Sequence, residues 1–291
     1  MISVVVISRD EPALGDTLEG VCEQARALGE PWEVVVVDAS EGRLERVRQR
    51  HPGVRWIDFT RPRGVAISIP HQRNLGVREA RGEIVVFTDA GCVPFPGWLE
   101  ELVEPLRHGG EQVAAGISSA PEGQEGLYDT RIHAAAENDY LPECPTLNMA
   151  FRREAFDAVH GFDESFEYGS DIDFSWRLVE AGRRIRSAPR AVVRHDWGSK
   201  RRQLRRAFLY GRARARLYNK HRSRLLSSWR SDPMIVVYPA FLLGLPLTLR
   251  FRLYPLLLAI PAWRNREEGP LRVVADHLAF GVGALSAVVR R

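Results

Sequence analysis

The sequence has little cysteine and no pair of cysteines at metal-binding spacing. Only three cysteines occur among the 291 residues, Cys22, Cys92 and Cys144, and they lie far apart. A structural zinc site needs closely spaced ligands, and a disulfide framework needs an even and dense set of cysteines. The cysteine pattern therefore argues against both and favours a reducing compartment.

The sequence also lacks a glycine-rich phosphate loop. The first apolar run, Ile2–Ile7, ends in Ser8-Arg9-Asp10-Glu11, where a dinucleotide-binding Rossmann fold would carry GxGxxG. No P-loop occurs, and a sugar nucleotidyltransferase would need a glycine-rich basic loop at the same place. Any nucleotide is therefore bound by other means, and nucleotidyl transfer is disfavoured.

Long apolar runs are absent. Met234–Leu249 has sixteen residues without a charge, interrupted by Pro239 and Pro246, and Leu253–Trp263 adds eleven more. Leu278–Val289 is a third short run. Each is shorter than the roughly 18–20 residues of a spanning helix. The prolines suit a re-entrant or interfacial hairpin, and buried helices are the alternative.

Acidic residues are absent between Lys200 and Arg230, a stretch with twelve Lys or Arg. Subtracting these twelve charges from the net charge of +4 leaves −8 for the rest of the chain. Apolar residues recur there at helical spacing, which predicts a basic amphipathic helix; they are Leu204, Phe208, Leu209, Ala213 and Leu217.

The basic segment indicates an anionic membrane surface as a partner, because acidic headgroups attract arginine. Nucleic acid could also bind such a segment, but no nucleic-acid recognition motif accompanies it, so nucleic acid is not an expected partner. A solvated helix face is the remaining alternative. We expect peripheral or monotopic association with the cytoplasmic face of the cell membrane, the alternative location being the cytoplasm.

What the sequence does contain is an alternation of short apolar runs and helical patterns. The runs Ile2–Ile7, Glu33–Val37, Val54–Phe59 and Ile84–Phe87 read as strands, with amphipathic stretches between them. This order predicts an α/β fold with a mostly parallel sheet flanked by helices. We expect one such domain over residues 1–198, followed by a basic and apolar helical appendage over 199–291.

Two carboxylates stand at predicted strand ends, Asp38 and Asp89. Open α/β sheets bind ligands at the carboxyl ends of their strands. Asp38 can accept hydrogen bonds from a ribose or a base, and Asp89 can ligate a divalent metal that bridges a diphosphate. The alternative for Asp38 is a cap of the next helix, and the alternative for Asp89 is a cap of the turn at Gly91.

A third carboxylate, Asp171, follows Gly169 and Ser170 at the predicted start of a helix. Asp173 lies two residues further on, so the two carboxylates do not face the same way on a helix. One can point into a site while the other caps the helix or faces solvent. Helix capping by Ser170 and Asp171 is the alternative to a role in chemistry.

Together these motifs resemble the family 2 inverting glycosyltransferases of the GT-A fold, over about residues 1–197. The ordered set is Ser8, Asp38, Arg73–Gly76, Phe87–Gly91, Asn148–Arg152, Gly161–Glu164 and Ser170–Asp171. The resemblance implies transfer of a sugar from a nucleotide-diphosphate donor to a hydroxyl of a glycan or lipid-linked acceptor. A non-catalytic nucleotide-sugar-binding or scaffold module of the same fold is the alternative.

The resemblance implies roles at the matching positions. Asp171 would be the catalytic base, and the donor would be bound by Ser8, Asp38, Arg73, Asn74 and Asp89. Asp89 would also be the first residue of a DxD motif that binds Mn²⁺ or Mg²⁺. Asn138, Asp139 and Asn148 are expected near the acceptor, with a polar surface loop as the alternative.

Two positions depart from the family pattern. Gly91 replaces the second DxD carboxylate, and Ser170 replaces the glutamate that usually precedes the catalytic aspartate. His195 is a second metal-ligand candidate, because related enzymes often place a late ligand there. A structural or solvated histidine is the alternative for His195.

Overall fold

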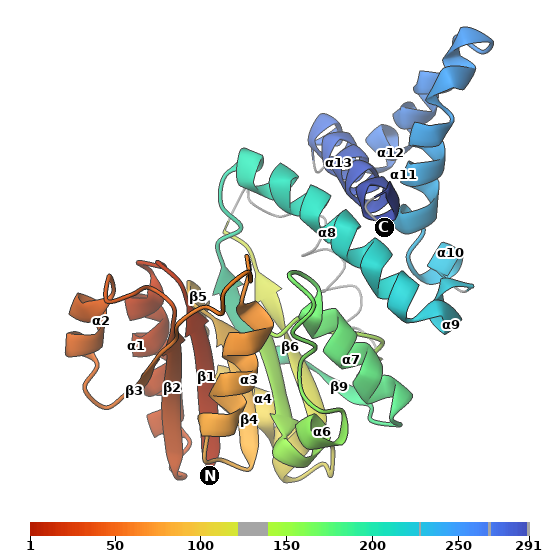
Figure 1. Ribbon diagram of the computed structural model, residues 1–291. Coiled ribbons are helices and arrows are strands. Elements are labelled where there is room, and N and C mark those ends of the chain that lie inside the picture. Colours follow the sequence, from red (N-terminus) through yellow and green to blue (C-terminus); the bar gives the residue numbers. More distant parts are fainter. Residues whose placement is uncertain (122–138, 227, 267–268, 290–291) are drawn as a thin grey trace. The chain divides into compact units, whose positions relative to one another are not determined.

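A nine-stranded sheet organises the first of two units in the computed structural model (Figure 1). The structure describes residues 1–121, 139–226, 228–266 and 269–289. The two units are Met1–Asp196 and Trp197–Arg291. The division proposed from the sequence, after residue 198, falls next to this boundary.

The first four strands are parallel, in the order β3-β2-β1-β4. Their bounds are β1 Ile2–Ser8, β2 Trp32–Asp38, β3 Arg55–Asp58 and β4 Ile84–Asp89. The central strands β1, β2 and β4 are buried on both faces, as parallel strands covered by helices must be. The sequence prediction is confirmed for this half of the sheet.

The other half of the sheet is mixed, which the sequence did not indicate. Beyond β4 lie β8 (Asn148–Arg152), β6 (Val113–Ser119), β9 (Ile185–His195) and β5 (Cys92–Pro94). β8 is antiparallel to β4 and β6, β6 is parallel to β9, and β5 is antiparallel to β9. A two-residue strand, β7 (Tyr140–Leu141), also pairs with β9.

Helices cover both faces of the sheet (Figure 1). α1 (Leu14–Ala27) and α4 (Trp98–Arg107) lie on one face; α3 (Ile69–Glu79), α6 (Arg153–Ala158) and α7 (Ser170–Glu180) lie on the other. The short helix α2 (Glu45–Arg50) follows β2. Pro70 stands in the first turn of α3, where the N–H that proline lacks would be unpaired in any residue.

A cluster of phenylalanines fills the core under α3, α6 and α7. Its members are Phe87, Phe151, Phe156, Phe162 and Phe174. The rings of Phe162 and Phe174 lie closest, with centroids 4.4 Å apart. Since Phe87 belongs to β4 and Phe174 to α7, the cluster holds the start of α7 near the end of β4.

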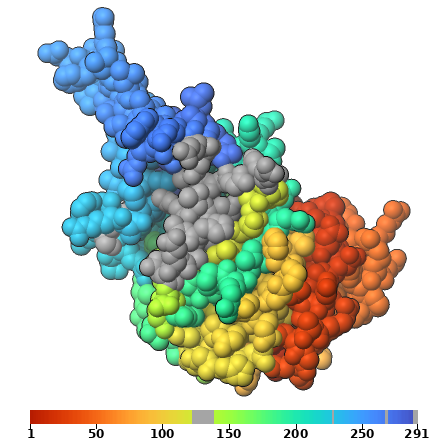
Figure 2. Space-filling view, turned by 180° about the vertical axis from the view of Figure 1, so that it is seen from behind, coloured from red at the N-terminus to blue at the C-terminus, as the bar shows by residue number. Residues whose placement is uncertain are grey.

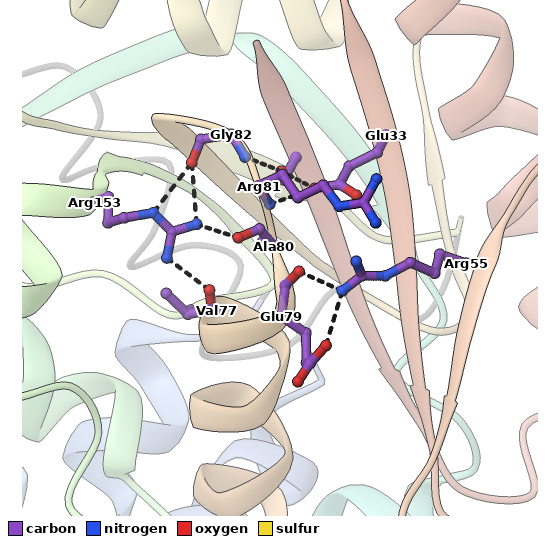
Figure 3. A network of polar contacts seen from close by, with 9 residues as sticks. Glu33, Arg55, Val77, Glu79, Ala80, Arg81, Gly82 and Arg153 are labelled. Atoms are coloured by element: carbon purple, nitrogen blue, oxygen red, sulfur yellow. Dashed lines mark hydrogen bonds and ion pairs between the residues drawn. The ribbon is translucent and has the colours of Figure 1, made fainter.

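A polar network fixes the C-terminal end of α3 beside the N-terminal ends of the parallel strands (Figure 3). Arg153 donates to the carbonyls of Val77 at 2.8 Å, Ala80 at 2.6 Å and Gly82 at 3.1 Å. Arg55 donates to the carbonyl of Glu79. The last carbonyls of α3 thereby gain cationic donors, which sets the helix position along the sheet.

The second unit consists of helices. α8 (Lys200–Lys220) packs against α13 (Pro270–Val289), and between them the chain forms α9 (Arg222–Leu225), α10 (Ser228–Ser231), α11 (Met234–Leu243), the 3₁₀ helices η1 (Leu245–Leu249) and η2 (Tyr254–Leu258), and α12 (Ala259–Arg264). The predicted basic helix is thus present as α8. Within the described residues, no helix combines the length and apolar content needed to cross a bilayer.

Candidate functional site

The C-terminal ends of β1, β2 and β4 bring three predicted site residues to one sheet edge. In the strand register Ser8 pairs with Asp38, and Ile7 pairs with Asp89. Ser8 and Asp38 are buried, whereas the Asp89 side chain is 37% exposed. The Ser8 hydroxyl has no hydrogen-bond partner among the described residues. A buried hydroxyl without a partner at an open sheet edge suits contact with a ligand.

The loops after β1 and β2 are tied together beside Asp38. One Asp38 oxygen accepts the Ser40 N–H at 3.0 Å, and the Ser40 hydroxyl accepts the Asp10 N–H at 2.7 Å. Arg43 pairs with Asp10, which lowers the pKa of that carboxyl, chiefly through their hydrogen bond. Asp38 therefore does brace the turn that follows it, with one oxygen, within a fixed rim.

Arg73 on α3 joins the two halves of the candidate site. Its guanidinium lies 3.9 Å from an Asp89 oxygen and donates to the Ser170 hydroxyl at 3.2 Å. It also stacks over the Phe162 ring at 5.6 Å, and only 7% of the side chain is exposed. A buried cation thus links the end of β4 to the first turn of α7.

Asp171 and Asp173 are used differently, as their spacing predicted. Asp171 is partly buried and accepts the Ile172 N–H at 2.9 Å. Asp173 is fully buried and pairs with Arg177 at 2.8 Å, so it neither faces solvent nor lies open to a ligand. Both aspartates lie in the first turn of α7. Only the Asp171 carboxylate is left accessible by the chain.

Asn74 is committed to the protein interior. Its amide nitrogen donates to the Phe162 carbonyl and to Glu164, each at 2.9 Å, and its oxygen accepts the Phe162 N–H at 2.9 Å. Gly161 has φ = +70°, and a Cβ there would lie 2.8 Å from the Asn74 oxygen. Asn74 therefore holds the Gly161–Glu164 turn under Arg73, and its amide is not open to a donor nucleotide.

Asn148, expected near the acceptor, is likewise an internal brace. It is buried, donates to the carbonyls of Ile117 and Ala191 at 2.8 Å, and accepts the Trp98 indole N–H at 2.8 Å. Its amide joins β6, β8, β9 and α4. The acceptor expectation for Asn148 rested on position alone, and its engaged, buried amide does not support it.

The rest of the expected acceptor segment divides in two. Asn138 lies outside the described residues. Asp139 is exposed and pairs with Arg186 at 2.9 Å. Further along, the Glu143 carboxylate accepts the Trp176 indole N–H at 2.7 Å, and the Ser175 hydroxyl donates to the Cys144 carbonyl at 2.8 Å. These bonds fasten residues 143–144 to α7, the helix that carries Asp171.

A divalent metal has fewer protein ligands here than the DxD pattern provides. Gly91 has φ = +93°, and its N–H donates to Thr17 at 2.9 Å. The carboxyl carbon of Glu11 lies 3.8 Å from where a Gly91 Cβ would stand. Within the described residues, no three His, Cys, Asp or Glu side chains form a metal-binding group.

The available oxygens nevertheless fit Mg²⁺ or Mn²⁺ bound together with a diphosphate. Such ions are held by one or two carboxylates plus substrate phosphates and water, rather than by a complete protein cage. Asp89 supplies one exposed carboxylate, and Glu11 lies beside the same turn. His195 contacts the Cys92 thiol at 3.3 Å through Nδ1, so β9 does bring this histidine beside the residue that follows Gly91.

Glu11 and Ser170 also lie at the candidate site, although the sequence assigns neither of them a role there. Glu11 follows the first strand by three positions, and strand-end loops form such edges, so its place in the chain was a signal. Ser170 was read as a departure from a family pattern or as a helix cap. In the structure its hydroxyl is a partner of Arg73, and no sequence pattern indicates this contact across 97 positions.

Comparison with known proteins gives a consistent result. The family profile described as "Glycosyl transferase family 2" matches residues 3–162. A pre-mycofactocin glycosyltransferase of Mycobacterium tuberculosis is 35% identical over 158 residues, 48% of this chain and 33% of that protein. The O-antigen biosynthesis protein RfbC of Myxococcus xanthus is 27% identical over 233 residues, 69% of this chain and 18% of that protein. The chain spans a third or less of these relatives.

The fold also resembles a solved structure. The mannosyltransferase PcManGT from Pyrobaculum calidifontis, in complex with GDP-Man and Mn²⁺, superposes with a TM-score of 0.71. The match covers 99% of this chain and 86% of that one, at 19% sequence identity. At this identity the likeness concerns the fold, which is the GT-A arrangement expected from the sequence.

Proposed function

The chain belongs to glycosyl transferase family 2, and on that premise we propose that it transfers a sugar from a nucleotide-diphosphate donor to an acceptor hydroxyl with inversion. The observation that carries this proposal is the position of Arg73. Its guanidinium stands between Asp89, at the end of β4, and Ser170, the residue before Asp171. A donor-side carboxylate and a candidate base thereby flank one fixed cation.

The donor nucleotide is proposed to lie across the ends of β1, β2 and β4. Asp38 and the unpartnered Ser8 hydroxyl are buried hydrogen-bonding groups at this edge. Arg73 lies behind Asp89 and adds positive charge next to the position proposed for the diphosphate. Fixed charges that face a leaving diphosphate stabilise it as its bond to the sugar breaks.

Mn²⁺ or Mg²⁺ is the proposed cofactor, held by Asp89 with help from Glu11 and, as a further candidate, His195. When bound, the ion neutralises charge on the departing diphosphate. PcManGT was solved with Mn²⁺, and the single exposed carboxylate here suits an ion that keeps substrate and water ligands. The Glu11 carboxylate would then take the place of the second DxD carboxylate, which is absent at Gly91.

Asp171 is the proposed general base. The acceptor oxygen forms a bond to the anomeric carbon, from the face opposite the nucleotide, while the bond from that carbon to the diphosphate oxygen breaks. The acceptor proton passes to the Asp171 carboxylate, and the electron pair of the broken bond leaves with the diphosphate. Attack from the opposite face inverts the anomeric configuration.

The acceptor is proposed to be a glycan or a lipid-linked glycan. Residues 143–144 are bonded to α7, so the segment before β8 borders the helix that carries the base. Asp139, exposed at the start of this segment, is the acceptor residue that we retain. The relative named for O-antigen biosynthesis supports a glycan acceptor.

We further propose that the reaction takes place at the cytoplasmic face of a membrane. The support is α8, whose sequence contains seven Arg, two Lys and no acidic residue. Acidic headgroups attract each such cation by about 1 kcal/mol near the membrane surface.

Titration calorimetry with a panel of nucleotide-diphosphate sugars tests this function. We expect one donor class to bind only with Mn²⁺ or Mg²⁺, and Asp89→Asn and Glu11→Gln each to weaken metal-dependent binding, by roughly 10–100-fold for a lost ligand or its support. Asp16→Asn, which removes an exposed carboxylate in the first turn of α1, is the matched control and should bind normally.

Failure of every donor to bind would contradict the proposed function. Donor binding that is equally tight without metal, and unchanged in both variants, would support the nucleotide site but contradict the proposed metal.

A further inference from the structure

The second unit carries an apolar arm, here defined as residues 243–263, whose large side chains face outward. Leu249 is 91% exposed, Leu253 73% and Trp263 69%, and Phe251 and Leu256 are also exposed. The arm projects from the rest of this unit at the upper left of Figure 2. Contiguous exposed apolar surface of this kind marks a binding surface rather than a solvated one.

Contacts within the chain give the arm a defined structure. Tyr254 stacks on Phe241 with ring centroids 5.1 Å apart, and its hydroxyl donates to the Phe241 carbonyl at 3.0 Å. Backbone N–H groups at Leu247, Arg250 and Tyr254 donate to carbonyls three residues earlier. The apolar side chains are therefore presented on a folded backbone whose N–H groups are largely satisfied, which an apolar environment requires.

Every charge on the arm itself is positive, and two more arginines follow it. From Pro233 to Arg266 the sequence has four arginines, Arg250, Arg252, Arg264 and Arg266, and the nearest acidic residues are Asp232 before this stretch and Glu267 and Glu268 after it. Arg250 lies 5.7 Å from the Phe251 ring, and Arg266 lies 5.4 Å from the Trp263 ring. Aromatic rings next to cations at the border of an apolar surface are typical of the interface between lipid and water.

We propose that this arm binds a bilayer containing acidic phospholipids and lies within the headgroup region. Arg250 and Arg252 separate η1 from η2, so an arm that inserted end-on would carry two guanidiniums into hydrocarbon. Lying in the interface lets the leucines meet acyl chains while the arginines stay with phosphates. A second copy of the arm fits less well, because a symmetric contact would bring arginines together without a carboxylate between them.

The lipid-binding arm deepens the proposed membrane location by naming the element that enters the membrane, and it is independent of sugar transfer. The two roles separate experimentally. Charge reversal on α8, as in Arg201→Glu/Arg205→Glu, weakens electrostatic attraction, whereas Leu249→Ser/Leu253→Ser removes only apolar contact from the arm.

Co-sedimentation of the full chain with phosphatidylcholine vesicles, with and without phosphatidylglycerol, tests the arm. We expect the wild type to sediment with phosphatidylglycerol vesicles, and Leu249→Ser/Leu253→Ser to bind about tenfold more weakly or worse. Leu226→Ser/Leu271→Ser is the matched control, because these leucines lie outside the arm and their exposures, 86% and 83%, fall between the 91% of Leu249 and the 73% of Leu253. It should bind within about twofold of the wild type. Circular dichroism confirms folding of each variant.

Three outcomes would overturn the proposal. The wild type could remain in the supernatant with both vesicle types. The arm variant could bind as well as the wild type while the α8 variant loses binding, which would show that the protein binds the membrane through α8 and not through the arm. Light scattering could instead show that the wild type is a dimer and the arm variant a monomer, which would mean that the arm contacts a second copy of the chain.

Discussion

At the scale of single residues, Arg73 is a buried cation with a carboxylate on one side and a hydroxyl on the other. Asp89 lies 3.9 Å away and the Ser170 hydroxyl 3.2 Å away. Ser170, in place of an acidic residue, offers a neutral hydroxyl to this guanidinium. The Arg73 charge therefore remains available to Asp89 and to the proposed donor site.

Arg73→Lys should lower transfer more than it lowers stability. Lysine keeps a positive charge but cannot reach both Asp89 and Ser170 with a planar fork. Charged hydrogen bonds are worth about 1.5–3 kcal/mol, so kcat/KM for the donor should fall roughly 10–100-fold. Arg78→Lys, exposed on the same helix, is the matched control. Equal kcat/KM in the two variants, measured by release of nucleoside diphosphate, would rule out the linking role.

Which residues lie at the sheet edge could be predicted, but what they bond to could not. Asp38 and Asp89 follow apolar runs, and that local pattern suffices to place them. The roles of Asn74 and Asn148 depend on partners such as Phe162 and Ala191, far away in the sequence. A motif match does not distinguish a structural asparagine from one that contacts a ligand. Only the hydrogen bonds of Asn74 and Asn148 show that they brace the fold.

At the scale of elements, the site depends on how α3 is held along the sheet. Arg153 binds three carbonyls at and after the C-terminal end of α3 (Figure 3). Arg73 lies on the same helix. The Arg153 hydrogen bonds at the N-terminal ends of the strands therefore help to fix the position of the Arg73 guanidinium at their C-terminal ends.

Arg153→Met should destabilise the first unit, because it leaves carbonyls of Val77, Ala80 and Gly82 without their cationic donor. We expect a loss of about 2–4 kcal/mol in the free energy of unfolding, measured by urea denaturation. Arg81→Met is the control: its exposed side chain is lost, but its backbone N–H still donates to Glu33. Matching midpoints for the two variants would show that the Arg153 hydrogen bonds contribute nothing.

Long elements could be predicted from the sequence, whereas short ones could not. The parallel strands show continuous apolar runs, so β1, β2 and β4 were evident. β5 has three residues and β7 has two, too few for any period to show. Pro189 lies within an interruption in the ladder between β6 and β9, from Ser187 to Val192, while β9 itself continues to His195.

At the scale of the whole molecule, the three free thiols are all buried in the first unit. Burial raises the pKa of Cys22 and Cys92, and it raises the pKa of Cys144 to about 12. The folded chain therefore keeps thiol protons that the unfolded chain, with a thiol pKa of about 8.5, releases in mild alkali.

Stability should consequently fall as the pH rises above about 8.5, by up to about 1.4 kcal/mol per pH unit for each thiol. The sign follows because the unfolded state binds fewer protons than the folded state in this range. Urea midpoints between pH 7.5 and 9.5 measure the slope. Cys92→Ala/Cys144→Ala should flatten it, and an unaltered slope would mean that these thiols titrate alike in both states.

Asp171→Asn tests the proposal that Asp171 is the base of a sugar transfer. With the donor and acceptor found for the wild type, we predict that turnover falls by roughly 10²–10⁴-fold while metal-dependent donor affinity is unchanged. Asp173→Asn, which breaks a buried pair with Arg177, should lower the melting temperature but keep turnover per folded molecule. Normal turnover by Asp171→Asn would contradict the assignment of Asp171 as the base.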